Sequence, residues 1–240
     1  MKKYFFLIAL AFMAAATACN KEGGNEDFSK KELTIKASVA TTKTAVTEEG
    51  IAWATGDALI VTCDGEAYNF TTTQSGAQVE FTSADGLTQE MVGINPLTAF
   101  YGCTQFGAFT IPQNQTISGG ESQTRLPMYA YTTTAPEKGV VEMTFTPAAS
   151  MLEVALAPIN DVKLNKVELI PVDETQVAGN VAGAGTVNAL TGKVTSSGNL
   201  KTISAVFPEG TSLKSGLTFR MPVGWSAMIS LMTMSYSEAS

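Results

Sequence analysis

The sequence predicts an all-β protein made of antiparallel β-sandwiches. Apolar and polar residues alternate with a period of two along most of the chain, as in strands with one buried face. Turn signals rich in Gly and Asp separate the alternating runs, and no segment keeps a helical pattern for three turns. A hydrophobic fraction of 45% in 240 residues is enough for one large or two modest cores.

The chain opens with the layout of a bacterial lipoprotein signal. Lys2 and Lys3 precede an apolar run over residues 4–15, and small residues lead from there to Cys19. The run is shorter than the roughly 20 apolar residues that span a bilayer. We therefore expect residues 1–18 to be removed as a signal peptide and Cys19 to become the lipidated N-terminus. An ordinary secretory signal with a chance cysteine is the alternative.

The segment after the cysteine is polar, acidic and glycine-bearing. Residues 20–27 contain no apolar anchor, so we interpret residues 19–31 as a flexible, acylated tether. Fatty-acyl chains such as palmitate on Cys19 would hold the protein on the membrane, because each buried methylene contributes about 0.8 kcal/mol.

Strand candidates follow in order along the rest of the chain. The first is residues 33–39, where Leu33, Ile35, Ala37 and Val39 alternate with polar residues. Similar alternation returns at residues 141–146, 152–156, 167–169 and 217–221. Pro147 follows one strong run and precedes another, which divides the protein into an N-terminal sandwich, residues 32–146, and a C-terminal sandwich, residues 147–240.

Aromatic residues crowd the first half of the chain, where core packing is their commoner role. We interpret Trp53 as a core anchor, and a stacking platform for sugars is the alternative.

Composition excludes several classes of function. The chain has no histidine, which removes Ser-His-Asp and Cys-His catalysis and histidine-based metal sites. The carboxylate pairs Glu48-Glu49 and Asp173-Glu174 are better read as solvated turns than as a glycosidase pair. A net charge of −7 makes nucleic acid an unfavourable partner. The sequence therefore predicts a protein that is not an enzyme and that has no cofactor or metal.

Two further cysteines, Cys63 and Cys103, lie in or just after apolar runs. The bacterial envelope is oxidising, so a disulfide between them is permitted. A buried free cysteine behaves as a small hydrophobe, and this alternative stays open.

A family resemblance rests on the run Trp53-Ala54-Thr55-Gly56-Asp57 followed by Leu59-Ile60-Val61. It resembles the W-x-x-G-D-x-[IL]-x-V signature of the fimbrillin family, the Mfa-like type V pilin lipoproteins of the Bacteroidales. Further matches follow in the family's order over residues 33–210, at residues 99–101, 126–130, 149–154, 165–169 and 190–192.

The resemblance implies two tandem transthyretin-like sandwiches of the Greek-key type. In these, Trp53 would plug the first sandwich, and Gly56 and Asp57 would form the turn before the next strand, with Asp57 capping backbone amides. An acidic stretch after the lipidated cysteine resembles the export signal to the cell surface, so we expect a lipid-anchored, surface-exposed protein of the outer membrane. A family second domain is usually longer, so residues 147–240 are expected to be short or incomplete.

Polymerising relatives assemble by strand exchange after a protease removes the first strand. Here the removable edge strand would carry Leu33, Ile35, Ala37 and Val39, and the incoming strand would be residues 227–234, with Met228, Ser230, Met232 and Met234 on one face. The arginines are Arg125 and Arg220, so cleavage would have to use a lysine such as Lys43.

Two functions therefore stay open from the sequence. One is a structural or anchor subunit of a fimbria that supports adhesion, with other fimbrillin-like subunits as partners. The other is a surface lipoprotein that does not polymerise and binds a glycan or a protein, including a ligand on a host or bacterial surface.

Overall fold

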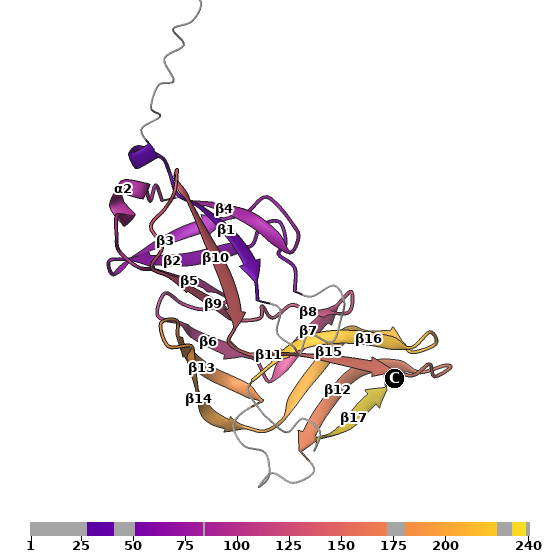
Figure 1. Ribbon diagram of the computed structural model, residues 1–240. Coiled ribbons are helices and arrows are strands. Elements are labelled where there is room, and N and C mark those ends of the chain that lie inside the picture. The colour runs from indigo at the N-terminus through magenta and orange to yellow at the C-terminus, as the bar shows by residue number, and fades with distance from the viewer. Residues whose placement is uncertain (1–27, 41–50, 84, 172–180, 225–231, 239–240) are drawn as a thin grey trace, which may run out of the picture.

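The computed structural model describes residues 28–40, 51–83, 85–171, 181–224 and 232–238. Strands are the dominant secondary structure of these residues, and turns and loops make up most of the rest (Figure 1). The helical elements are a 3-10 helix, η1 (Phe28–Lys30), and a single turn of α-helix, α2 (Gln89–Val92). Within the described ranges, no helix is long and apolar enough to cross a membrane. The all-β prediction is confirmed.

Seven strands close into a barrel in the order β1-β10-β9-β5-β2-β3-β4. Closure depends on β1, which pairs with β10 on one side and with β4 on the other. The bounds are β1 (Thr34–Val39), β2 (Ala58–Cys63), β3 (Glu66–Thr71), β4 (Gln78–Ser83), β5 (Leu97–Tyr101), β9 (Met128–Thr132) and β10 (Val140–Pro147). Alternate residues of these strands point inward and are buried, as the period of two predicts.

The remaining strands form two sheets. A seven-stranded sheet has the order β11-β16-β8-β7-β15-β12-β17, and a three-stranded sheet has the order β14-β13-β6. The bounds are β6 (Ala108–Ile111), β7 (Asn114–Ser118), β8 (Glu121–Ser122), β11 (Ser150–Leu156), β12 (Lys163–Pro171), β13 (Ala182–Asn188), β14 (Lys193–Leu200), β15 (Ile203–Ser212), β16 (Leu217–Val223) and β17 (Met232–Glu238).

The segment that contains β6, β7 and β8 links the two halves of the chain. It leaves the barrel after β5 and returns to it at β9. In between, β6 pairs with β13, β7 with β15 and β8 with β16. The predicted boundary between residues 146 and 147 stays a prediction. Residues 108–122 were expected in the first sandwich, but the strand pairing shows that they contribute strands to the sheets of the second half.

The arrangement of strands differs from the predicted antiparallel sandwiches. The first half is a closed barrel, and β1–β10, β7–β15 and β8–β16 are parallel pairs. The period of two reports which face of a strand is buried but carries no information on the neighbouring strand. Parallel neighbours need long connections, and each of these pairs joins segments that are far apart in the chain. The strand pairing therefore does not confirm the arrangement as two Greek-key sandwiches.

One apolar core runs through both halves. Its buried residues include Leu33, Phe70 and Phe145 in the barrel and Val167 and Phe219 in the seven-stranded sheet. The four largest fully buried side chains are Phe70, Phe81, Phe145 and Phe219, so core packing is confirmed for Phe70 and Phe81, whereas Phe106 is exposed.

Candidate functional site

Trp53 is buried in the barrel core. It is 2% exposed, and its ring makes edge-to-face contacts with Phe81, Tyr101 and Phe145 at centroid distances of 5.1, 5.3 and 5.2 Å. Its backbone N–H donates to the carbonyl of Gly76 at 2.8 Å. The indole Nε1 finds no hydrogen-bond partner among the described residues. This position leaves no open face on which a sugar could stack.

The turn after Trp53 positions the start of β2. The N–H of Asp57 donates to the carbonyl of Ala54 at 3.0 Å, and Gly56 between them has a φ of +88°. A positive φ at the third turn residue is the geometry that glycine adopts most readily. The carboxylate of Asp57 accepts the N–H of Ala54 at 2.8 Å, so the side chain caps the turn.

Asp57 also connects the turn to the barrel wall. Its other carboxylate oxygen accepts a hydrogen bond from the Tyr101 hydroxyl at 2.8 Å. Burial, followed by this hydrogen bond and the charge of Asp57, raises the pKa of Tyr101 well above its ordinary value. The guanidinium of Arg125 lies 5.6 Å from the centre of the Tyr101 ring. The Tyr101 ring therefore links the turn at Asp57 and the Arg125 guanidinium to Trp53 in the core.

Strand β1 is the predicted removable strand, and the structure corrects its predicted position at a sheet edge. Each residue from Thr34 to Ser38 has a partner on both sides, in β4 and in β10. Leu33, Ile35 and Ala37 are fully buried, while Val39 is only partly buried. A strand with two neighbours can close the barrel, which an edge strand cannot do.

Only part of the predicted incoming strand can be placed. Met228 and Ser230 lie outside the described residues. Met232 and Met234 belong to β17, whose backbone pairs with β12 at one end of the seven-stranded sheet. The structure does not bring these residues to β1.

Cys63 and Cys103 are free thiols. In the β2–β5 pair, Cys63 is opposite Leu97, and Cys103 comes six residues after Leu97. At about 3.3 Å per residue that offset is on the order of 20 Å, far beyond the Cα separation of a disulfide. Burial raises the pKa of Cys103 to about 12, and burial together with the charge of Asp64 raises the pKa of Cys63.

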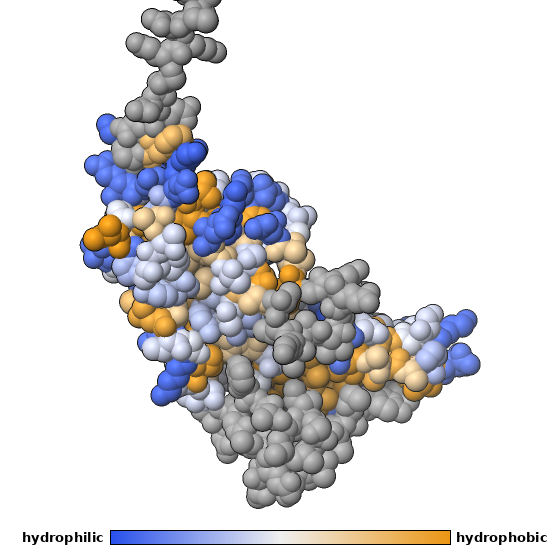
Figure 2. All heavy atoms as spheres, viewed as in Figure 1, coloured by the Kyte–Doolittle hydropathy of each residue, from blue (hydrophilic) through white to orange (hydrophobic). Residues whose placement is uncertain are grey.

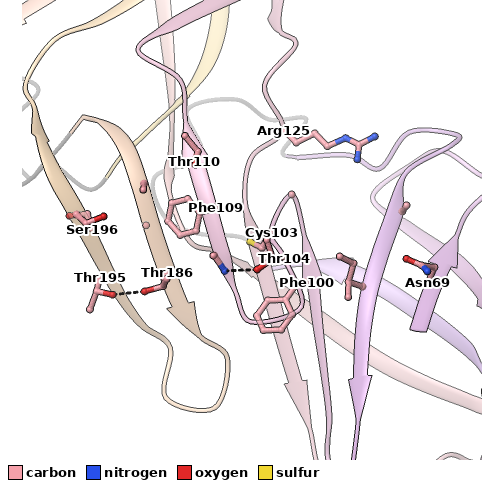
Figure 3. Close-up of a pocket in the computed structure, with 17 residues that line it drawn as sticks. Asn69, Phe100, Cys103, Thr104, Phe109, Thr110, Arg125, Thr186, Thr195 and Ser196 are labelled. Atoms are coloured by element: carbon pink, nitrogen blue, oxygen red, sulfur yellow. Dashed lines mark hydrogen bonds between the residues drawn. The ribbon is translucent and has the colours of Figure 1, made fainter. Parts of the chain in front are cut away.

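A groove of about 1010 Å³ runs between the barrel and the three-stranded sheet (Figure 3). Ile60, Phe100 and Asn69 line it from the barrel. The opposite wall carries Phe109 of β6 and a set of small or hydroxyl-bearing residues, namely Thr110, Ala184, Thr186, Thr195, Ser196 and Ser197.

Close packing between β6 and β13 shapes one wall of the groove. The ring of Phe109 lies over the backbone of Gly185, where a Cβ would come within 2.5 Å of the ring. The hydroxyls of Thr186 and Thr195 lie 2.6 Å apart and share a hydrogen bond, and the Asn69 amide donates to Asp85 at 3.0 Å. Arg125 contributes a cation to the lining and makes no ion pair within the described part of the chain.

This set of groups suits the binding of a ligand. Hydroxyls, aromatic rings and one guanidinium match a neutral or weakly anionic ligand such as a glycan or an extended peptide. Among the described residues, no three His, Cys, Asp or Glu side chains lie together in a way that could hold a metal ion.

Sequence reasoning did not identify this groove. Its residues come from strands that are distant in the chain, and Thr, Ser and Phe are ordinary strand residues. The glycines at positions 183 and 185, inside β13, were the available signal for a close approach of another element.

The fold and the groove define an all-β protein in which a closed barrel is joined to two further sheets, with a groove between the barrel and one of them. No protein-family model matches the chain, and neither does any curated protein sequence.

Solved structures do match. A candidate cell adhesion protein from Bacteroides ovatus is 16% identical with a TM-score of 0.50, and the match covers 86% of each chain. A candidate cell adhesion protein from Bacteroides thetaiotaomicron is 14% identical with a TM-score of 0.43, over 87% of this chain and 84% of that one. At this identity the first match indicates a shared fold.

Proposed function

We propose that the protein is a cell-surface lipoprotein that acts as a structural or anchor subunit of a fimbria and supports adhesion. The lipoprotein signal, the fimbrillin-like signature and the description of the B. ovatus structure as a candidate cell adhesion protein support this role. Acylation of Cys19 would anchor the protein in the outer membrane, and its partners would be other fimbrillin-like subunits.

The observation that carries the proposal is the place of β1 in the barrel. Its apolar row is buried, and its backbone pairs with β4 and β10 (Figure 1). Loss of β1 would open the barrel, expose an apolar cleft and leave two rows of backbone donors and acceptors without partners. A strand from a neighbouring subunit would remove both costs on insertion.

A disulfide lock tests this route of assembly. Ser38 and Thr144 are partners in the β1–β10 register, and their hydroxyl oxygens lie 3.3 Å apart on the exposed side. In the Ser38→Cys/Thr144→Cys protein, oxidation should hold β1 in place after a lysine-specific protease has cut at Lys43. We expect trimmed wild-type protein to form ladders on native gels and the oxidised double variant to stay monomeric.

The reduced double variant is the matched control and should form ladders again. Equal ladders from the oxidised variant would overturn exchange through β1. If trimmed wild-type protein also stays monomeric, the second function takes the lead, in which a surface lipoprotein that does not polymerise uses the groove of about 1010 Å³ to bind a glycan or a peptide.

A further inference from the structure

One end of the barrel gathers the elements nearest to the predicted tether. The N–H of Gln89 in α2 donates to the carbonyl of Lys31 just after η1, at 3.3 Å. The side-chain oxygen of Gln89 accepts the N–H of Gly139 at 2.6 Å. Residues 28–32, 88–96 and 137–139 therefore form one surface, here named the tether end (Figure 1).

The tether end holds two exposed apolar side chains. Ile94 is 92% exposed and Met91 is 50% exposed, whereas Val92 between them is fully buried. Hydrogen bonds fix this turn, because the N–H of Asn95 donates to the carbonyl of Val92 at 2.8 Å and Thr88 caps α2. Single exposed apolar residues are ordinary, but two on one short, hydrogen-bonded turn form a small apolar tip.

Charged side chains surround this tip without adding up to a net charge. Lys30, Lys31 and Lys138 are exposed there, and so are Glu32, Glu90 and Glu137. Figure 2 shows hydrophilic residues at this end of the barrel with hydrophobic residues beside them. Because the whole chain carries −7, its negative charge lies elsewhere.

The length of the tether limits how far this end can lie from the lipid. Nine peptide units separate Cys19 from Phe28. A flexible chain of this length has a root-mean-square span of about 15 to 18 Å and cannot exceed roughly 30 Å. With Cys19 acylated, the tether end would thus be held close to the bilayer.

We propose that the tether end is a membrane-contact surface, in which Ile94 and Met91 insert among the lipid headgroups of the leaflet that holds the acyl chains. This inference rests on the proposed acylation of Cys19. Apolar groups at such a surface enter about 5 to 10 Å into the boundary between headgroups and acyl chains. Because the tether end carries no net charge, the contact should depend little on salt or on the content of anionic lipid.

A fluorescent probe at position 94 tests the contact. The full-length acylated Ile94→Cys protein is labelled with nitrobenzoxadiazole and reconstituted into phosphatidylcholine vesicles. Cys63 is buried and Cys103 is partly buried, and both thiols have a raised pKa, so they should react more slowly than the introduced thiol. We expect blue-shifted emission and at least twofold quenching by lipids with a nitroxide near the headgroup, unchanged between 0.1 and 1 M salt.

Ile159→Cys is the matched control. Ile159 is also apolar and 40% exposed, and it lies in the connection between β11 and β12. In Figure 1 this connection projects at the right of the view, away from α2 and the tether end. Its probe should emit as in water and resist quenching. Equal emission from the two probes, or quenching at position 94 that 1 M salt abolishes, would overturn the proposal.

Acylation of Cys19 is tested by a separate measurement. Mass spectrometry of the mature protein reports whether Cys19 carries acyl chains, independently of any probe. An unacylated Cys19 would overturn the lipoprotein assignment and this inference with it. An acylated protein whose position-94 probe stays in water would overturn the membrane contact alone.

Discussion

At the scale of single residues, Trp53 determines much of the barrel's packing. Its three edge-to-face contacts join β4, β5 and β10 through one ring. We expect Trp53→Ala to lower the free energy of unfolding by about 3 to 5 kcal/mol, the usual cost of deleting a buried aromatic side chain. Urea titration followed by circular dichroism measures this change.

Trp53→Phe is the control, because it keeps an aromatic ring in the core and removes the indole N–H. Since the indole Nε1 has no partner among the described residues, losing its N–H costs no hydrogen bond there. The cost should therefore be well below that of Trp53→Ala. A loss below about 1 kcal/mol for Trp53→Ala would contradict the core role.

Whether Cys63 and Cys103 form a disulfide could not be decided from their spacing in the sequence. We expect the non-reduced protein to show two free thiols by mass spectrometry after alkylation in denaturant, because the strand register separates Cys63 from Cys103. Without denaturant, alkylation at pH 8 should be slow, because burial raises the pKa of both thiols. A mass lower by two hydrogens, with no alkylation of either thiol, would contradict this expectation.

The raised pKa of Cys103 also makes stability depend on pH. Its pKa is about 12 in the folded protein against an ordinary 9.0, so above pH 9 the unfolded chain loses this proton more readily than the folded chain. The contribution is fully present below pH 9 and is lost as the pH rises toward 12. Urea midpoints should therefore fall between pH 8 and pH 10.5, and by less in Cys103→Ala. An equal fall in both proteins would contradict this assignment.

At the scale of elements, sequence and structure agree on the strands and differ on their neighbours. The alternation in residues 33–39 predicted β1 with its buried face, and it did so because burial acts on each strand separately. The parallel pairing of β1 with β10 depends on contacts across more than 100 residues, which no local pattern records. The groove was missed for the same reason.

Gly107, at the entry to β6, offers a test of how tightly the two halves are joined. Its φ is +74°, and a Cβ there would overlap the carbonyl oxygen of Val187, whose N–H donates to the carbonyl of Gly107. Gly65, in the turn between β2 and β3, has a φ of +84° but open space around it. Gly65→Ala should cost about 1 to 2 kcal/mol of backbone strain, and Gly107→Ala clearly more.

The difference between these two alanine variants isolates the contact from the backbone strain, because both glycines have nearly the same φ. Differential scanning calorimetry of the two proteins gives that difference. Equal costs would mean that β6 and β13 can move apart to accommodate the added methyl group without a loss of stability. The groove beside this junction would then have no fixed shape.

At the scale of the whole molecule, residues 108–122 make the halves depend on each other. They belong to the first half of the chain, yet they supply β6 to one sheet of the second half and β7 and β8 to the other. The same apolar core cluster extends from the barrel into the seven-stranded sheet. If unfolding of the barrel also displaced residues 108–122, strands β13, β15 and β16 of the second half would each lose a paired neighbour.

We therefore expect both halves to unfold in a single transition. Pulse-labelling hydrogen exchange across a urea series should give one midpoint for peptides from β1 in the barrel and from β15 in the seven-stranded sheet. Trp53→Ala, a change inside the barrel alone, should shift both midpoints by the same amount. If only the β1 midpoint moved, the halves would be domains that unfold independently, although residues 108–122 connect them. The barrel could then open for strand exchange without disturbing the second half.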